Sequence, residues 1–142
     1  MNKALFSSTT QTWTTPKELF DELHQEFGFT CDVAASEDNA LCEQYFDESK
    51  DGLAQDWFGN VWCNPPYDTS KEWIAKAYNE TKKECSLAVL LLPARTDTKA
   101  FHSYIYNSPN VEVRFLKGRL KFSNSKNSAP FPSMICIFKK HV

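Results

Sequence analysis

The stretch Ser86–Leu92, with the sequence SLAVLLL, decides the fold because it is a continuous apolar run of strand length. A strand that is apolar at every position is buried on both faces, which is typical of a mainly parallel sheet with helices on either side. The run therefore predicts a buried strand in an α/β fold. Further strands are expected within residues 29–35, over Asn60–Cys63, Val111–Phe115 and Met134–Lys139.

Helical signals alternate with these strands. Thr15 followed by Pro16 predicts a helix start, with Thr15 as N-cap and Pro16 at the first helical position, and Gly28 predicts its end. Other segments follow from apolar spacing and polar flanks: a helix from Ser70 to about Glu84, a helix from Asp97 to about Asn107, and a hairpin arm starting at Gly118–Phe122. The acidic and poorly periodic span from Glu37 to Gln55 predicts a loop with at most one helical stretch around 38–46. Residues 1–12 are polar and read as a flexible lead-in to a single domain, 13–142.

Composition agrees with one soluble globular domain. The chain has 142 residues, 42% of them hydrophobic, and no apolar run near the ~20 residues that span a bilayer. The five cysteines form no CxxC pair, which argues for reduced thiols and against a zinc site, so no metal is expected. A cytoplasmic location follows from the same observations.

Charge is divided unevenly along the chain. Residues 1–70 carry 3 Lys against 13 Asp and Glu, which gives 3 − 13 = −10, whereas residues 71–142 carry 13 Lys and Arg against 5 acids, which gives 13 − 5 = +8. The asymmetry predicts one acidic and one basic functional surface. A basic surface suits phosphates, and an acidic one tolerates a cationic ligand.

The chemistry is suggested by Asn64-Pro65-Pro66-Tyr67, which directly follows the apolar run Val61-Trp62-Cys63. The carboxamide oxygen of Asn64 and the carbonyl oxygen of Pro65 can accept hydrogen bonds from a planar amine, and the two prolines restrict the backbone around them. Acceptors held in this way favour the pyramidal nitrogen that attacks a methyl group. Tyr67 would offer an aromatic face to the planar group that carries this amine.

These residues belong to an ordered set of motifs that spans about Trp13 to Phe138. The set comprises Trp13-Thr14-Thr15-Pro16, residues 27–36, Asp51-Gly52-Leu53 with Asp56-Trp57, Asn64-Pro65-Pro66-Tyr67, residues 91–98 and residues 118–122. In this order it resembles the phage DNA N6-adenine methyltransferase family, the short Dam-like enzymes of phages and prophages. The resemblance implies a trimmed Rossmann-like fold, S-adenosylmethionine as cofactor, double-stranded DNA as partner and the host-cell cytoplasm as location.

On the cofactor side, the resemblance places Asp32-Val33-Ala34-Ala35-Ser36 where relatives have a glycine-rich loop. Asp32 would lie near the amino group of the methionine moiety, and Ala34 would let the backbone approach the ligand. Trp13, Thr15 and Pro16 would form the N-terminal cofactor motif, with Thr15 near the methionine carboxylate. Asp51 or Asp56 would be the acidic residue that precedes Asn64, with Asp56 preferred. Asp47 and Glu48 are read as surface residues.

On the DNA side, the basic segment between Leu116 and Pro130 reads as a loop that lies on the nucleic acid. Candidate phosphate contacts are Arg95, Lys99, Lys117, Arg119, Lys121 and Lys126. The target base would have to be extruded from the duplex. Because no separate recognition domain is evident, specificity would be short, encoded in loops or supplied by a homodimer.

Other functions stay open at this stage. Cytosine C5 methylation is rejected because Cys63 precedes the motif in the wrong order for the nucleophile. Methylation of cytosine N4 or of protein glutamine uses the same amine chemistry. A catalytically inactive DNA-binding or anti-restriction module is a further alternative, favoured by the missing glycine-rich loop and disfavoured by the intact Asn-Pro-Pro-Tyr motif.

Overall fold

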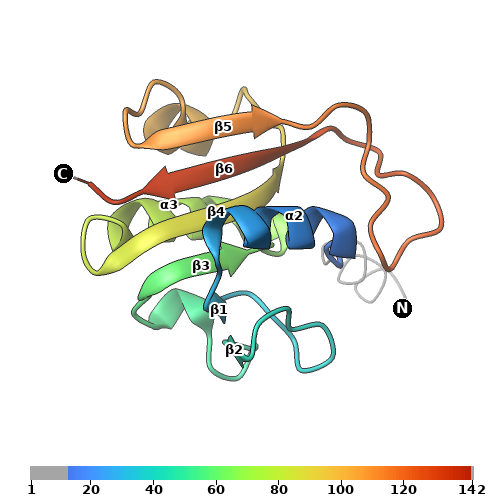
Figure 1. Cartoon of the computed structure of the whole chain (residues 1–142). Helices are drawn as coiled ribbons and strands as arrows, with labels where there is room; N and C mark the ends of the chain where they lie inside the picture. Colours follow the sequence, from blue (N-terminus) through green and yellow to red (C-terminus); the bar gives the residue numbers. More distant parts are fainter. Residues whose placement is uncertain (1–12, 142) are drawn as a thin grey trace, which may run out of the picture.

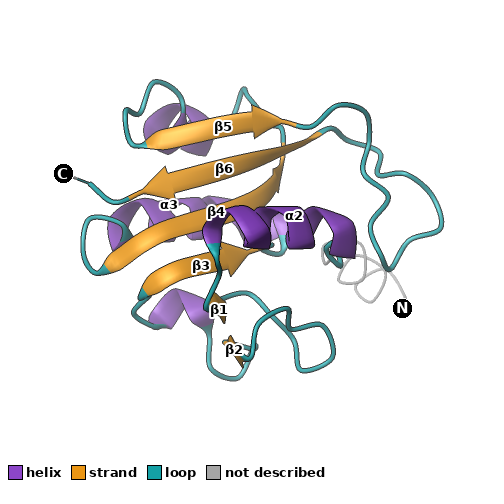
Figure 2. Ribbon diagram, viewed as in Figure 1, coloured by secondary structure: helices purple, strands orange, loops and turns teal. Residues whose placement is uncertain are grey.

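The computed structural model describes residues 13–141, which form one six-stranded sheet flanked by helices (Figures 1 and 2). The strand order across the sheet is β2-β1-β3-β4-β6-β5. The strands are β1 (Cys31–Asp32), β2 (Gln44–Tyr45), β3 (Gly59–Cys63), β4 (Cys85–Pro93), β5 (Val111–Phe115) and β6 (Ser133–Lys139). The longer helices are α2 (Lys17–Phe27) and α3 (Ser70–Glu80), with a one-turn π-helix at Phe101–Ile105 and short 3₁₀ turns at Gly52–Ala54 and Tyr67–Thr69.

Five of the six strands run in the same direction. β1 is parallel to β2 and β3, and β3 is parallel to β4. β6 is antiparallel to both β4 and β5, so β5 points the same way as β4. The expectation of a mainly parallel sheet is therefore confirmed, with β6 as the antiparallel strand. The carboxyl ends of the five parallel strands share one edge of the sheet, which is on the right in Figure 1.

The apolar run of β4 is buried on both sides, as its sequence predicts. Successive side chains of a strand point to opposite faces. Val89 and Leu91 pack in one core cluster with Phe20 and Leu23 of α2. Ala88, Leu90 and Leu92 pack in the other cluster with Trp73, Ile74 and Ala77 of α3. In Figure 2, α2 lies in front of the sheet and α3 behind it. β4 thus joins two hydrophobic layers.

The span between Glu37 and Gly59 contains little regular secondary structure. One edge strand of two residues, β2, is formed within that span. Residues 38–46 form no helix, in agreement with the predicted loop, and the end of this segment pairs with β1 and the turn after it: Phe46 N–H donates to Asp32 O, and Ala35 N–H donates to Phe46 O. These bonds use the backbone groups that a helix would need.

Several element boundaries also differ from the prediction. α2 begins at Lys17, Pro16 is extended, and no side chain caps the helix, so Thr15 is not an N-cap. α3 ends at Glu80 rather than Glu84, the helix expected over 97–107 is reduced to the π-helix turn, and no strand forms at 118–122. Gly28 does end α2, with the left-handed φ of 67° that glycine tolerates. The lead-in predicted for residues 1–12 lies outside the described residues.

All five cysteines are free thiols, as their spacing predicted. No helix within residues 13–141 is long and apolar enough to cross a membrane. No group of three or more His, Cys, Asp or Glu side chains in the same range is arranged to hold a metal ion.

Candidate active site

A cleft of about 600 Å³ opens beyond the carboxyl ends of β1, β2 and β3. Ligands of open α/β sheets bind at this edge, and the volume falls in the usual range of about 300–1,000 Å³ for small-molecule sites. The floor is built from residues 33–37, which follow β1, and from residues 46–49, which follow β2. Asn64 and Pro66, after β3, border the same space. The cleft therefore brings a ligand pocket next to the Asn-Pro-Pro-Tyr motif.

The cleft is lined by acidic side chains. Within residues 13–141, five carboxylates border it and no lysine or arginine does; the acids are Glu37, Asp47, Glu48, Asp51 and Asp68. Ala34, Ala35 and Ser36 add small side chains that leave the backbone accessible. Such a lining favours a positively charged ligand of moderate size.

One wall of the cleft is fixed by a close approach of the backbone. Gly52 lines the cleft, and a Cβ atom placed on it would lie 2.0 Å from the carbonyl oxygen of Val33 and 3.1 Å from the Trp73 ring. Asp51, the preceding residue, has a positive φ of 56° and accepts a hydrogen bond from Leu53 N–H. Only glycine fits at position 52 without movement of β1 or α3.

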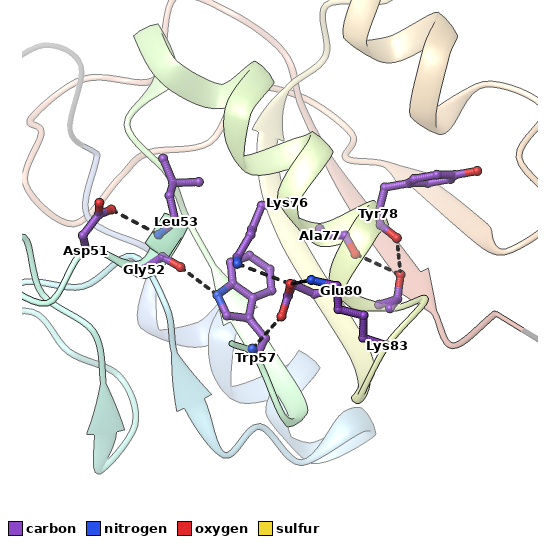
Figure 3. Close-up of polar contacts among 10 residues, drawn as sticks. Asp51, Gly52, Leu53, Trp57, Lys76, Ala77, Tyr78, Glu80 and Lys83 are labelled. Atoms are coloured by element: carbon purple, nitrogen blue, oxygen red, sulfur yellow. Dashed lines mark hydrogen bonds and ion pairs between the residues drawn. The ribbon is translucent and has the colours of Figure 1, made fainter. Parts of the chain in front are cut away.

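This wall is tied to α3 through Trp57 and Glu80 (Figure 3). The Trp57 indole N–H donates to Gly52 O at 2.9 Å, and the Trp57 backbone N–H donates to the Glu80 carboxylate at 2.8 Å. Glu80 is buried and lies 3.3 Å from the ammonium groups of Lys76 and Lys83. Burial alone would raise the pKa of Glu80, but the Trp57 N–H and the two lysines outweigh it and lower that pKa.

The carboxamide of Asn64 is held in one orientation. Its Nδ2 donates to the backbone oxygen of Trp13 and to the hydroxyl of Thr15, the latter at 2.9 Å. Its Oδ1 is buried and has no hydrogen-bond partner within residues 13–141. A buried acceptor without a donor is costly to fold and is frequent at functional sites. Asn64, which borders the cleft, therefore carries a buried acceptor with no donor in that range.

Tyr67 belongs to an aromatic cluster rather than to the cleft lining. Its ring meets Phe131 edge-on at a centroid distance of 5.3 Å and Phe122 at 6.4 Å. Trp13 contacts the same two phenylalanines at 5.2 and 5.6 Å. The Tyr67 hydroxyl is buried without a partner in the described part of the chain, and burial raises its pKa. The cluster joins the motif to the loop of residues 116–132, which we call the β5–β6 loop.

The six residues expected to contact a cofactor are not brought together. Ala34 lines the cleft, whereas Trp13, Thr15, Pro16 and Asp32 do not. Asp56 precedes β3 and borders a separate hollow at the amino end of that strand. The preference for Asp56 over Asp51 therefore needs correction, because of these two carboxylates only that of Asp51 lines the cleft.

Asp32 lies under the cleft loop and organises it. Its carboxylate accepts hydrogen bonds from Leu41 N–H at 3.1 Å and Ala34 N–H at 3.4 Å, which closes the turn that follows β1. Because the side chain is buried without a cation beside it, its pKa is raised to about 6.

Sequence reasoning missed several cleft residues. Asp47 and Glu48 were read as surface residues but line the cleft, as do Phe46, Asp68 and Trp73. The position of Phe46, Asp47 and Glu48 depends on β2, a strand of two residues that no periodicity can reveal. A usable signal was the acidic run Asp47-Glu48 with Asp51, in a chain half that already carries a strong negative charge.

The candidate DNA-binding residues also lie at the carboxyl ends of the strands. They are on the opposite side of β3 from the cleft. Arg95 and Lys99 follow β4, and Lys117, Arg119, Lys121 and Lys126 belong to the β5–β6 loop. All six are exposed, and no ion pair involves any of them within residues 13–141. Figure 1 shows this loop descending past the strand ends toward the start of α2. Along the edge, acids therefore follow β1 and β2, Asn64 follows β3, and free cations follow β4 and β5.

Comparison with known proteins identifies the family. The family model "DNA N-6-adenine-methyltransferase (Dam)" matches residues 3–141. The chain belongs to the Dam family. Within curated proteins it is 31% identical over 102 residues to the DNA N-6-adenine-methyltransferase of Escherichia phage T1. That match covers 70% of this chain and 42% of the phage protein, so the chain spans less than half of that relative.

Solved structures agree with the fold of this Dam family member. The 23S rRNA methyltransferase ErmE superposes with a TM-score of 0.60 at 10% identity, covering 92% of this chain and 70% of ErmE. A Pyrococcus horikoshii protein described as an RNA methyltransferase gives a TM-score of 0.62 at 13% identity, covering 93% of this chain and 89% of that one. The Rossmann-like methyltransferase fold is therefore confirmed.

Proposed function

We propose that this protein transfers a methyl group from S-adenosylmethionine to the N6 amine of adenine in double-stranded DNA. The observation that carries the proposal is the Asn64 carboxamide, whose nitrogen is held by two acceptors while its buried oxygen has no donor within residues 13–141. Membership of the Dam family supports the choice of adenine in DNA.

The geometry suits an exocyclic amine as nucleophile. The lone pair of this amine is delocalised into the base, and hydrogen bonds from its N–H groups to Asn64 Oδ1 and Pro65 O would favour the pyramidal form. Pro65 is buried, and no hydrogen bond to its carbonyl oxygen is formed from within residues 13–141. Neither acceptor is therefore used by residues 13–141, and Tyr67, three positions after Asn64 in the chain, would support the base by stacking once it leaves its contacts with Phe122 and Phe131.

The acidic cleft fits the cofactor. S-adenosylmethionine, when bound, supplies an electrophilic methyl group on a cationic sulfonium. The carboxylates of Asp47, Asp51 and Asp68 offset the positive charge of such a ligand, and Ala34 and Ala35 leave room along the backbone. Since Asn64 and Pro66 border this cleft, the ligand and the acceptors for the amine share one space.

The direct test is methylation of DNA. Purified protein is incubated with S-adenosylmethionine and unmethylated genomic DNA, and modified positions are read by single-molecule sequencing. We expect N6-methyladenine in a short shared sequence context. N4-methylcytosine would instead support the alternative amine, and absence of any methylation together with absence of cofactor binding by calorimetry would support an inactive DNA-binding module.

The role of Asn64 is tested by Asn64→Ala. We expect this variant to bind S-adenosylmethionine as the wild type does and to lose turnover by about 10²–10³-fold, the usual cost of removing one such acceptor or donor. Asn79→Ala, the same change at an exposed position of α3 that does not line the cleft, serves as the control and should keep turnover far above that level. Normal turnover in Asn64→Ala would remove Asn64 from the mechanism.

A further inference from the structure

The segment Trp13-Thr14-Thr15 contacts Asn64 directly. Asn64 Nδ2 has two N–H groups, and the two acceptors that face it are the backbone oxygen of Trp13 and the hydroxyl of Thr15. A carbonyl oxygen can only accept a hydrogen bond, so the amide nitrogen, not its oxygen, must point toward Trp13. In a flipped amide, Oδ1 would face the Trp13 oxygen, and two acceptors would repel each other.

The position of Thr15 suits a hydrogen bond to Asn64 better than contact with a ligand in the cleft. It is 6% exposed, it does not border the cleft, and it makes no cap to α2. Its hydroxyl is therefore committed to Asn64 rather than to the helix or to the cleft. The distance of 2.9 Å between Thr15 Oγ1 and Asn64 Nδ2 is that of a good hydrogen bond.

The same segment is held on its other side by the β5–β6 loop. Ser123 N–H donates to Thr14 O and Ser123 Oγ donates to Thr15 O, both at 3.0 Å. Thr14 N–H donates to Asn124 Oδ1 at 3.0 Å. Ser123 and Asn124 stand in the loop that carries Lys117, Arg119, Lys121 and Lys126. A continuous chain of hydrogen bonds thus runs from the basic loop through Thr15 to Asn64.

We propose that Thr15 is a positioning residue for the Asn64 carboxamide, and that Ser123 in the β5–β6 loop holds Thr15 in place. The segment of the molecule that meets DNA would then also set the orientation of the amide that receives the base. This inference deepens the proposed function and rests on it, because the amide is positioned for the amine of adenine. It replaces the expectation that Thr15 contacts the cofactor.

The test uses the full chain and two readouts. The first is the side-chain amide signal of Asn64 in a ¹H–¹⁵N NMR spectrum without cofactor or DNA, assigned by its disappearance in Asn64→Asp. The second is the kcat, the KM for DNA and the Kd for S-adenosylmethionine. Thr15→Val removes the hydroxyl at similar volume, and Thr15→Ser keeps it.

We expect Thr15→Val to shift the Asn64 amide signal toward that of an amide with one hydrogen bond fewer. Its kcat should fall at least tenfold while the Kd for S-adenosylmethionine stays within twofold, and Thr15→Ser should restore both values. An unchanged Asn64 signal in folded Thr15→Val would overturn the proposal. If cofactor affinity and turnover are both lost while the Asn64 signal is unchanged, Thr15 contacts the cofactor rather than positioning Asn64.

Ser123→Ala tests whether the hydrogen bond from Ser123 Oγ to Thr15 O holds Thr15 in place. It also keeps the proposal testable if Thr15→Val does not fold. It removes the hydroxyl that holds Thr15 O and leaves every direct contact of Asn64 in place, so a shifted or broadened Asn64 signal supports the chain. Ser125→Ala is the matched control, since Ser125 Oγ bonds only within its own loop, to Asn127 O. Equal signals in Ser123→Ala and Ser125→Ala would refute the link. If the wild type methylates no DNA, the proposed function fails, yet the NMR signal still decides the positioning of Asn64.

Discussion

At the scale of single residues, the cleft depends on a position that has no side chain. Gly52 lies so close to Val33 O and to the Trp73 ring that a methyl group there requires the backbone to move. Its neighbour Asp51 adopts a positive φ while lining the same cleft. Backbone strain of this kind persists only where the surrounding structure fixes it, and it clusters at binding sites.

We predict that Gly52→Ala lowers the free energy of unfolding by about 1–3 kcal/mol, as overpacking does, and weakens S-adenosylmethionine binding. Chemical denaturation and calorimetry measure the two effects. Gly118→Ala is the control, because a Cβ there meets no atom within 4 Å although its φ of +76° is strained. It should cost stability without loss of cofactor affinity, and equal cofactor affinities in the two variants would contradict the prediction.

Asp32 gives a prediction about pH. Its pKa in the folded protein is raised by burial to about 6, above the value of about 3.9 for an unfolded chain. Between these values the folded state binds more protons, so the free energy of unfolding falls as pH rises from about 4 to about 6, by at most about 1.4 kcal/mol per pH unit.

Asp32→Asn should remove this falling contribution, so that the difference in the free energy of unfolding between the variant and the wild type changes with pH in that window. Urea unfolding at pH 4, 5, 6 and 7 measures the two profiles, and Asp56→Asn, at an exposed carboxylate, should follow the wild type. Parallel profiles for wild type and Asp32→Asn would show that the Asp32 carboxyl does not titrate in this range.

At the scale of elements, α3 supports the cleft from behind. Glu80 accepts the Trp57 backbone N–H and pairs with Lys76 and Lys83, and the Trp57 indole in turn holds Gly52 O. A helix on one face of the sheet is therefore connected to the loop that walls the cleft. The same helix buries Trp73, whose ring contacts position 52.

We predict that Glu80→Ala lowers the free energy of unfolding by about 1–3 kcal/mol, because the buried Trp57 N–H is left without an acceptor. Glu80→Gln keeps an acceptor for the Trp57 N–H but loses the pairing with Lys76 and Lys83. Its free energy of unfolding should therefore lie between those of Glu80→Ala and the wild type. The stabilising contribution of Glu80 is present at neutral pH and is lost as pH falls through its lowered pKa. Thermal unfolding at pH 7 ranks the variants, with the exposed Glu84→Ala as control, and Glu80→Ala as stable as Glu84→Ala would exclude this support.

At the scale of the whole molecule, the acids of the cleft and the exposed cations that follow β4 and β5 lie on opposite sides of β3, although the two halves of the sequence also meet, as in the ion pair between Glu26 and Arg114. The sheet order places the ends of β2 and β1 on one side of β3, and the ends of β4 and β5 on the other. The acidic cleft and the exposed cations therefore flank Asn64 along one edge. Under the proposed function, this arrangement would give the cationic cofactor and the polyanionic substrate separate approaches to Asn64.

We predict that Arg119→Ala weakens binding to DNA of any sequence and reduces the slope of log K against log salt by about 0.9, the value for one phosphate contact. Fluorescence anisotropy with a labelled duplex at several salt concentrations measures the slope. Lys82→Ala is the control, since Lys82 lies between α3 and β4, at the opposite edge of the sheet. Identical slopes for Arg119→Ala and the wild type would place the DNA elsewhere.

The sequence by itself determined the strands and the reactive motif, because both depend on local signals. The apolar run of β4, the strand before Asn64, the end of α2 at Gly28 and the five free thiols are set by short-range composition and spacing. The order of the motifs sufficed to give the family.

Only the tertiary structure decided which side chains meet. β2 is too short for any periodic pattern, so the cleft residues that follow it could not be assigned. Thr15 follows the local rule for an N-cap, but its hydroxyl bonds to Asn64, 49 residues away in the sequence, and a long-range contact outweighs a local preference. The same reason applies to Asp32, whose carboxylate bonds to Leu41 N–H, and to Asp56, which lies at the amino end of β3 and away from the cleft. The partners of a side chain depend on strand order and direction, which no single segment encodes.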